Sequence, residues 1–294
     1  MGCIRNIKST ECRSKKFYNT KIIFQEISSP CYIKDAVINF EELEFESDEY
    51  LDRDMENARD VFDSIRKKFR ADHKCFEHGL DHFKDLGQST DSIFQIAMQA
   101  AFKEITGEIP TNWNPANTSH FLGGRLDTFR SVTPESIKVV EMLENDFTDS
   151  ASLEMLQKSA LVHRKLAKNA NSGFAFDRFL QALIYENDKN YYSEFINELK
   201  NDTIYQKMLK PDIIASNSSF GLDFCLMPAK SKSQIEFQYS TEKDKISWCC
   251  TGWENNKYGD IAKELSTKVK DNLEKTSNFL MDDRNKNEKL FALN

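Results

Sequence analysis

Two short polar stretches in the second half of the chain carry side chains that could bind a small molecule. Arg178 lies in the stretch Phe176–Phe179, and a fixed guanidinium suits a carboxylate, often through two parallel hydrogen bonds. Arg178 could equally form a structural ion pair with Asp177 or another acid. Ser216 and Ser218 place two hydroxyl groups close together, although such a run is also common turn material.

Histidine is the residue most often used as a general base. The chain has five histidines, and only His73 stands in a catalytic type of spacing, His-x-x-x-Glu, with Glu77. We expect the other four to be ordinary surface or partly buried imidazoles.

Composition and charge narrow the class of protein. The chain has 294 residues, 39% hydrophobic, and a formal net charge of -7, which makes non-specific nucleic-acid binding a poor hypothesis. The seven cysteines are odd in number and form no Cys-x-x-Cys pair, which argues against a zinc site or a disulfide scaffold and for a reducing compartment. We expect no metal site. No run is apolar enough to span a membrane. We therefore expect an intracellular protein, without choosing among cytoplasm, mitochondrion and peroxisome.

The periodicity of apolar residues predicts helices first, then short strands, then a closing helix. Thr133 and Pro134 are typical of a helix start, and Gly107 of a helix end. This order predicts a mixed α/β (α+β) lobe, with helices packed on a mixed β-sheet. Helices are expected at 48–71, 91–105, from 133, at 150–173, 175–187, 190–209 and 259–281, and strands at 213–214, 235–239 and 246–249.

One long stretch resembles a known family. Carnitine/choline O-acyltransferases carry the pattern G-x-x-x-x-T-Y-E-S-x-S-T-x-x-F-x-x-G-R-T-E-T-x-R-S, and this chain matches it without a gap between 107 and 131. The helix that begins near Asp91 resembles the family's D-A-F-I-Q-L-A-L-Q-L-A-Y, and 176–180 and 216–218 resemble its x-D-R-H-L and S-T-S motifs. The matched positions in the long stretch are Gly107, Thr118, Phe121, Gly124, Arg125, Thr128, Arg130 and Ser131.

The resemblance implies acyl transfer between coenzyme A and carnitine or choline. It makes Ser218 the candidate donor to the tetrahedral oxyanion, with Ser216 as its neighbour. Arg178 matches the arginine that carnitine enzymes of the family keep, so it favours carnitine. Trp113 and Leu126 replace the family's Tyr and Thr beside the carnitine carboxylate, and both changes remove a hydroxyl.

The resemblance also implies a site for coenzyme A, as a co-substrate rather than a bound cofactor. The family uses two lysines for the 3′-phosphate, and here the matching pair is Leu80 and Lys84. Asp91 matches the family's adenine contact, but it could equally be a helix cap.

The family's catalytic histidine has no recognisable counterpart. Counted back from Asp91, it would fall near the first residue, so we expect 1–40 to be an irregular N-terminal remnant and 41–294 to be one lobe of a two-lobed fold. We expect this lobe to be truncated, inactive alone and in need of a companion lobe or partner chain. The alternative is a genuine short protein, a non-catalytic coenzyme A-binding or protein-interaction lobe; a helical scaffold without a ligand is the third interpretation.

Overall fold

The computed structural model describes residues 46–147, 150–186, 193–218, 227–231, 234–254, 257–258 and 260–292. The chain divides into two compact units, one made of Met1–Lys68 with Phe220–Asp223 and one of Phe69–Ser219 with Phe224–Asn294. Residues 1–40 lie outside the described residues, so the predicted boundary at residue 40 stays a prediction.

The first unit contributes one described helix, α1 (Glu49–Arg66). Asp48 caps it by accepting a hydrogen bond from the Leu51 N–H at 2.8 Å, as an N-cap aspartate does. The sequence prediction ran this helix on to residue 71, and that was wrong, because Phe69 begins a strand.

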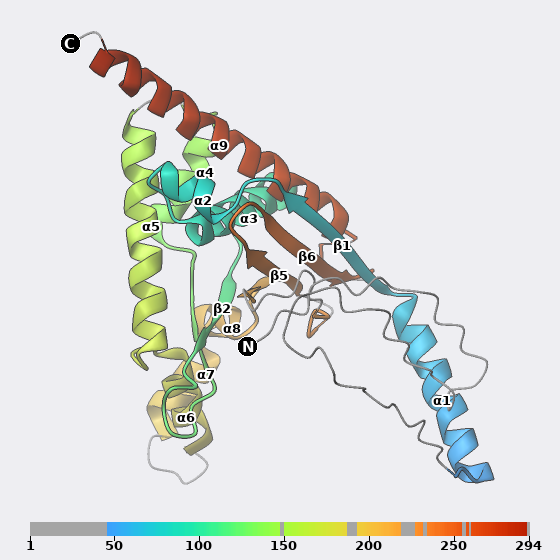
Figure 1. Cartoon of the computed structure of the whole chain (residues 1–294). Helices are drawn as coiled ribbons and strands as arrows, with labels where there is room; N and C mark the ends of the chain where they lie inside the picture. Colours follow the sequence, from blue (N-terminus) through green and yellow to red (C-terminus); the bar gives the residue numbers. More distant parts are fainter. Residues whose placement is uncertain are drawn as a thin grey trace, which may run out of the picture. The chain divides into compact units, whose positions relative to one another are not determined.

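The second unit is built on a six-stranded mixed sheet (Figure 1). The strand order is β1-β6-β5-β4-β2-β3. β4 runs parallel to both β2 and β5, and the other neighbouring pairs are antiparallel. The strands are β1 (Phe69–Phe76), β2 (Asn112–Asn117), β3 (Leu126–Phe129), β4 (Ile213–Asn217), β5 (Ile235–Thr241) and β6 (Ile246–Trp253).

Helices pack on this sheet, which confirms the predicted mixed α/β class. Helix α3 begins after its cap Ser89 and ends at Gly107, whose φ of 75° suits a glycine. Thr133 and Ser136 form a capping box at the start of α4. The helices are α2 (Leu80–Asp85), α3 (Thr90–Thr106), α4 (Pro134–Glu144), α5 (Ser150–Asn171), α6 (Asp177–Glu186), α7 (Ser193–Asn201), α8 (Thr203–Leu209) and α9 (Ala262–Ala292).

One predicted helix is in fact two. The helix expected over 190–209 breaks between α7 and α8, because Asp202 has an extended backbone and its carboxylate accepts from the Tyr205 N–H at 2.7 Å. An N-cap aspartate starts a new helix at this point.

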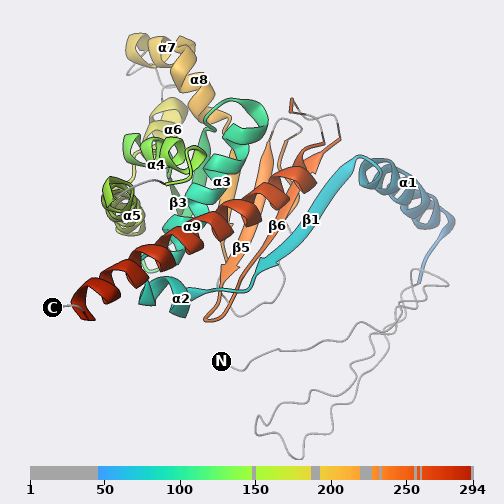
Figure 2. The same cartoon turned by 90° about the horizontal axis from the view of Figure 1, so that it is seen from above.

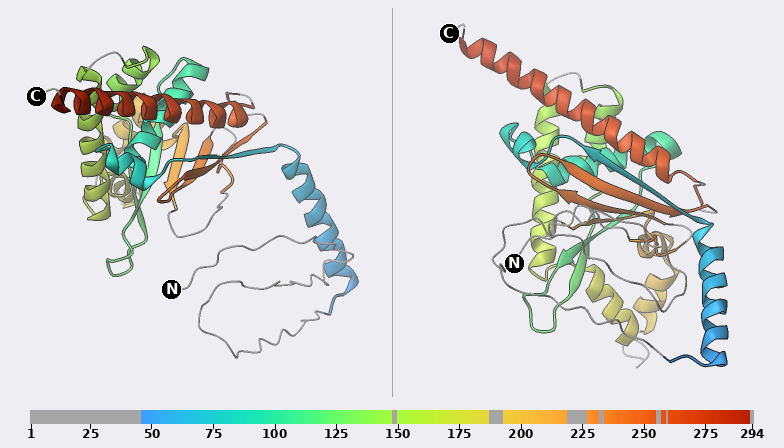
Figure 3. Two further views of the ribbon diagram at one scale, coloured as in Figure 1. Left: turned by 45° about the horizontal axis from the view of Figure 1, so that its top comes forward. Right: turned by 45° about the vertical axis from the view of Figure 1, so that its right-hand side comes forward.

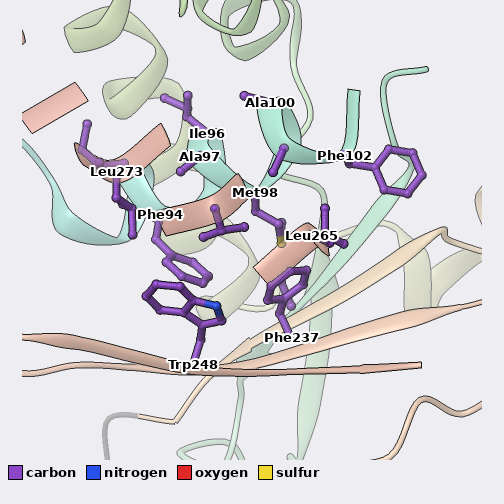
Figure 4. Packing of buried hydrophobic residues seen from close by; sticks show 14 of the residues in the cluster. Phe94, Ile96, Ala97, Met98, Ala100, Phe102, Phe237, Trp248, Leu265 and Leu273 are labelled. Carbon is purple, nitrogen blue, oxygen red and sulfur yellow. The ribbon is translucent and has the colours of Figure 1, made fainter. Parts of the chain in front are cut away.

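The core lies between one face of the sheet and the helices α3 and α9, which cross it in Figures 2 and 3. Phe94 of α3 packs against Trp248 and Tyr239, with ring centroids 5.7 and 4.2 Å apart. Figure 4 shows Phe94 above Trp248 and Phe237, with Leu265 and Leu273 of α9 beside them. Each of the five side chains that Figure 4 labels here is at most 1% exposed, namely Phe94, Trp248, Phe237, Leu265 and Leu273. Burying apolar side chains in close contact stabilises the fold.

Candidate functional site

The pleat of the sheet sorts the predicted residues onto two faces. Ile213 and Ala215 of β4 belong to the core beneath α3 and α9, and Asn217 reaches Asp91 of α3. Because side chains alternate along a strand, Ser216 points to the opposite face. Trp113 pairs with Ile214, and cross-strand partners share a face, so Trp113 lies on that opposite face too. We call this face, which carries Trp113, Ile214 and Ser216, the acceptor face.

Ser216 and Ser218 lie at the carboxyl end of β4. Ser216 is half-buried and pairs with Gln238 of β5. The Ser218 N–H continues the ladder by donating to the Tyr239 carbonyl at 2.8 Å. Its hydroxyl is 3.5 Å from the same carbonyl, at the limit of a hydrogen bond, so it is weakly engaged and could donate to an oxyanion.

Leu126 and Arg178 line one hollow of about 640 Å³. Leu126 comes from β3 and Arg178 from the first turn of α6. Arg178 is exposed and donates to Gln181 Oε1 at 2.8 Å. The other lining residues are Thr118, Phe121, Gly123, Gly124, Arg125, Asp127 and Gly173.

The predicted alternative for Arg178, an ion pair with Asp177, is wrong. Asp177 instead pairs with Arg130 at 3.2 Å and accepts from the Thr128 hydroxyl at 2.8 Å. Neighbouring residues in a helix point in different directions, so Arg178 faces away from the carboxylate that precedes it.

Trp113 lies apart from that hollow and against Arg130. The Arg130 guanidinium carbon is 5.5 Å from the centroid of the indole ring, within the range of a cation–π contact. The match to the family pattern included Arg130, but no local pattern predicts that Arg130 lies beside Trp113. Only the path of β2 and β3 brings the two together.

Asp91 lies on the other face, at the start of α3, and it is not the helix cap that the sequence allowed. Ser89 is the cap, and its hydroxyl accepts from the Ser92 N–H at 3.4 Å. Asp91 Oδ1 accepts from the Tyr239 hydroxyl at 2.6 Å and from Asn217 Nδ2 at 2.9 Å. Its Oδ2 accepts from His163 Nε2 of α5 at 2.7 Å.

These contacts set the acidity of two groups. Burial would raise the pKa of Asp91, but the hydrogen bonds and charge of His163, with the bonds from Tyr239 and Asn217, hold it below its ordinary value. Burial and the neighbouring Asp91 carboxylate raise the pKa of Tyr239 well above that of a free tyrosine. Tyr239 therefore stays protonated and donates to Asp91.

A buried polar network extends from this point along α3. Gln95 donates to the Tyr239 hydroxyl at 2.9 Å and accepts from the Ser131 hydroxyl at 2.7 Å. Asn112 of β2 accepts from the Ser131 N–H at 3.1 Å, and Gln99 donates to the Ser131 carbonyl at 3.3 Å. The sequence signal was the spacing of 91, 95 and 99, which places three polar residues on one face of an otherwise apolar helix.

The remaining coenzyme A candidate, Lys84, is exposed on α2. Leu80, at the other position of the family's lysine pair, is 42% exposed at the start of the same helix. The roles predicted for Lys84 and Asp91 toward coenzyme A stay predictions.

None of the five histidines stands next to Ser216 or Ser218. His73 lies in the same row across the sheet as Ser216, but Gln238 and Cys249 separate them, and three strand spacings amount to about 14 Å. His163 is on the α3 face with Asp91. His78, His82 and His120 lie outside β4 and β5, in or next to α2 and in the β2–β3 connection.

Comparison with known proteins identifies the family of this chain. The family model for choline/carnitine O-acyltransferases matches residues 15–271. The chain therefore belongs to the choline/carnitine O-acyltransferase family.

Three curated relatives illustrate the relation. The chain is 30% identical to human carnitine O-acetyltransferase over 132 residues, 44% of this chain and 21% of that protein. It is 28% identical to human mitochondrial carnitine O-palmitoyltransferase 2 over 153 residues, which are 51% of this chain and 23% of that protein. It is 28% identical to rat choline O-acetyltransferase over 114 residues, which are 38% of this chain and 18% of that protein. The chain thus spans about a fifth to a quarter of the length of these relatives.

Solved structures show a weaker likeness. A chloramphenicol acetyltransferase covers 73% of this chain and 94% of its own, with a TM-score of 0.40 and 12% identity. The match to the epimerization domain of tyrocidine synthetase B covers 74% of this chain and 49% of that chain, with a TM-score of 0.41 and 9% identity. Similarity at this level does not carry a function.

Among the residues that the structure describes, no helix is long and apolar enough to cross a membrane.

Proposed function

We propose that this chain binds acyl-coenzyme A and a carnitine-like acceptor, as the substrate-binding part of a carnitine acyltransferase. The observation that carries the proposal is that Trp113 and Ser216 share one face of the sheet, with Ser218 just beyond the end of β4. Trp113 and Ser216 are about a hundred positions apart in sequence. The resemblance assigns the counterpart of Trp113 to the carnitine carboxylate and the counterparts of Ser216 and Ser218 to the oxyanion.

The two substrates would approach from opposite sides. Asp91 and Lys84, the candidates for coenzyme A, belong to α3 and α2, whereas the acceptor candidates lie on the acceptor face or in the hollow with Arg178. A guanidinium in this region favours carnitine, which has a carboxylate, over choline, which has none.

We propose further that the chain binds these substrates without transferring the acyl group by itself. A general base must stand within hydrogen-bond reach of the proton that it takes, and no histidine does so near Ser216 or Ser218. The chain would then act as a binding lobe, and a companion lobe or partner chain would supply the base. The compartment in which it works stays a prediction.

Two measurements on the purified chain test this proposal. Calorimetric titration with coenzyme A and with L-carnitine should show binding of both. A thiol-release assay with acetyl-coenzyme A should show no carnitine-dependent rate above the uncatalysed background. Absence of heat at millimolar coenzyme A would refute binding, and a carnitine-dependent rate that is lost in Arg178→Ala would refute the claim that the chain does not transfer.

A further inference from the structure

Large apolar side chains are exposed where the β2–β3 connection meets the segment between α5 and α6. Leu122 of that connection is fully exposed, and Phe174 is 80% exposed. The two segments touch, because a Cβ on Gly173 would lie 3.4 Å from the Phe121 ring. Such a concentration of exposed apolar side chains marks a contact surface rather than ordinary scatter. We call this group the apolar ridge; its members are Phe121, Leu122, Leu126, Phe174, Phe176 and Phe179.

Exposed cations border the apolar ridge. Arg164, Lys165 and Lys168 recur at helical spacing on the exposed side of α5, so they form a stripe along that helix. Arg125 of the β2–β3 connection and Arg178 of α6 are exposed as well. Both α5 and α6 contact β3, and Figures 1 and 2 show the carboxyl end of α5 and α6 together with the β2–β3 hairpin. The apolar ridge and the cations therefore belong to one end of the second unit.

The charge of this end differs from that of the whole chain. The stretches 117–131 and 161–180 contain only two acids, Asp127 and Asp177. Each is 8% exposed, and Asp177 is paired with Arg130. The exposed charges of these two stretches are thus all positive, although the chain as a whole carries -7. Because charges farther away than about 8 Å are largely screened at physiological salt, a surface that approaches this end meets its cations and not the net charge.

This combination fits the surface of a membrane. Apolar side chains that project from a folded protein can enter the boundary between headgroups and acyl chains, while neighbouring cations attract anionic headgroups. Two of the five cations, Lys165 and Lys168, are lysines, which protein–protein interfaces tend to exclude. Leu122 already projects fully into solvent, so it could enter lipid without any change of fold.

We propose that this end of the second unit docks on an anionic lipid bilayer, with the apolar ridge in the headgroup region and the α5 cations over the phosphates. Binding of this kind is interfacial and needs no helix that crosses the membrane. The proposal goes beyond the proposed function and does not depend on it. Leu122, Phe174 and the cations of α5 are not among the substrate candidates, so variants at these positions test docking alone.

Flotation of the full chain with lipid vesicles measures docking. Vesicles of phosphatidylcholine alone are compared with vesicles in which about a third of the lipid is phosphatidylglycerol. At about 0.1 M salt, we expect the chain to float with the anionic vesicles and to partition about 10-fold less onto the neutral ones. At about 1 M salt, its partition onto the anionic vesicles should fall to the neutral level, because salt screens the cations.

The apolar contribution is tested by two substitutions at exposed positions. Leu122→Ser and Phe174→Ser should each lower partition onto the anionic vesicles about 10-fold, since each removes a large apolar side chain from the ridge. Phe62→Ser is the matched control, because Phe62 of α1 is 62% exposed and lies outside the ridge. It should change partition less than about twofold.

The cationic contribution needs a charge-matched comparison. Lys165→Gln combined with Lys168→Gln should lower partition onto the anionic vesicles about 10-fold and leave the neutral vesicles unaffected. The control combines Lys138→Gln of α4 with Lys263→Gln of α9, which removes two exposed lysines elsewhere. If both pairs weaken partition equally, overall charge and not this surface binds the lipid, and the proposal is overturned.

Two further outcomes overturn the proposal. The wild-type chain could stay in solution with anionic vesicles at about 0.1 M salt, in which case the ridge serves a protein partner. Leu122→Ser and Phe174→Ser could float as well as Phe62→Ser, in which case another part of the chain contacts the lipid. A circular dichroism melt confirms that each variant is folded. None of these results bears on the titrations with coenzyme A and carnitine, so failure of docking leaves the proposed function standing.

Discussion

Asp91 joins four elements through a single carboxylate. From the start of α3 it accepts hydrogen bonds from α5, β4 and β5, through His163, Asn217 and Tyr239. Bonds to a charged acceptor are stronger than neutral ones. Whatever contact Asp91 makes with coenzyme A, its first role in this fold is to hold these elements in position.

Removing the charge of Asp91 should therefore destabilise the protein. The Asp91 side chain is 34% exposed, and solvent screening weakens its bonds, so Asp91→Asn should cost about 1–2 kcal/mol at pH 7. Because the native pKa is below the unfolded value, wild-type stability from this group is present above about pH 4 and is lost as the pH falls through the native pKa.

Urea denaturation of the wild type and Asp91→Asn at pH 7 and pH 3 measures this effect. The difference between the two proteins should shrink at the lower pH. Asp81→Asn, at an exposed position of α2, is the control and should be neutral. An equal loss at both pH values would mean that geometry, and not charge, is what Asp91 contributes.

Glu236 should behave in the opposite way. Burial raises its pKa, and Lys230 offsets this only in part. The native state then holds this proton more tightly than the unfolded state, so the ionised group costs stability as the pH rises from the ordinary glutamate value through the native pKa. Glu236→Gln should stabilise the ligand-free protein by about 1 kcal/mol at pH 7.

Thermal melts of Glu236→Gln and the wild type between pH 4 and pH 8 check this prediction. The gain should be small at pH 4 and largest at pH 8. A variant that melts below the wild type at pH 7 would show that Glu236 is already paired in the free protein.

The connection from β1 to α2 fits tightly against the β5–β6 hairpin. The backbone N–H groups of Leu80 and Asp81 donate to the carbonyls of Glu242 and Lys243, at 2.7 and 3.0 Å. Gly79 leaves no room at this crossing, since a Cβ there would lie 2.2 Å from the Glu242 carbonyl oxygen. A Cβ at this position would meet backbone atoms only, and these cannot rotate away as a side chain could.

Gly79→Ala should therefore destabilise the protein by about 2 kcal/mol, through forced displacement of the hairpin. Gly252→Ala in β6 is the matched control, because a Cβ there meets its nearest neighbour, Ala262, only at 4.0 Å. Chemical denaturation of both variants measures the difference. Equal effects would show that the hairpin moves freely.

The same strand, β1, shows why some elements escape sequence-based prediction. Its residues, Phe-Arg-Ala-Asp-His-Lys-Cys-Phe, include no β-branched side chain and follow directly on a helical pattern. The strand forms because it pairs along its whole length with β6, about 180 positions away, and no local signal contains that partner. Helix α4, in contrast, is recognisable from Thr133 and Pro134 alone, because its cap is made within one turn.

For the whole molecule, we propose that the two substrate sites lie on opposite faces of the sheet. Lys84→Gln on α2 should weaken coenzyme A about 3- to 5-fold, as expected for one exposed cation facing a phosphate. It should leave 3′-dephospho-coenzyme A and carnitine unchanged. Trp113→Phe should weaken the binding of carnitine and leave the binding of coenzyme A unchanged.

Parallel titrations of both variants with the three ligands test this separation. Asp81→Asn on α2 serves again as the control for general effects on that helix. If Lys84→Gln weakens carnitine as much as coenzyme A, the two sites are not independent, and the assignment of substrates to opposite faces is wrong.

Local patterns in the sequence determined the mixed α/β class, most helix boundaries and the family motifs, because caps, periodicity and motif spacing act within a few turns of chain. The tertiary structure alone decided which residues face one another. Arg130 rather than Asp177 or Arg178 lies beside Trp113, and Glu236 lies two strands away on the same face. Strand register makes those choices, and register depends on pairing between segments far apart in the sequence.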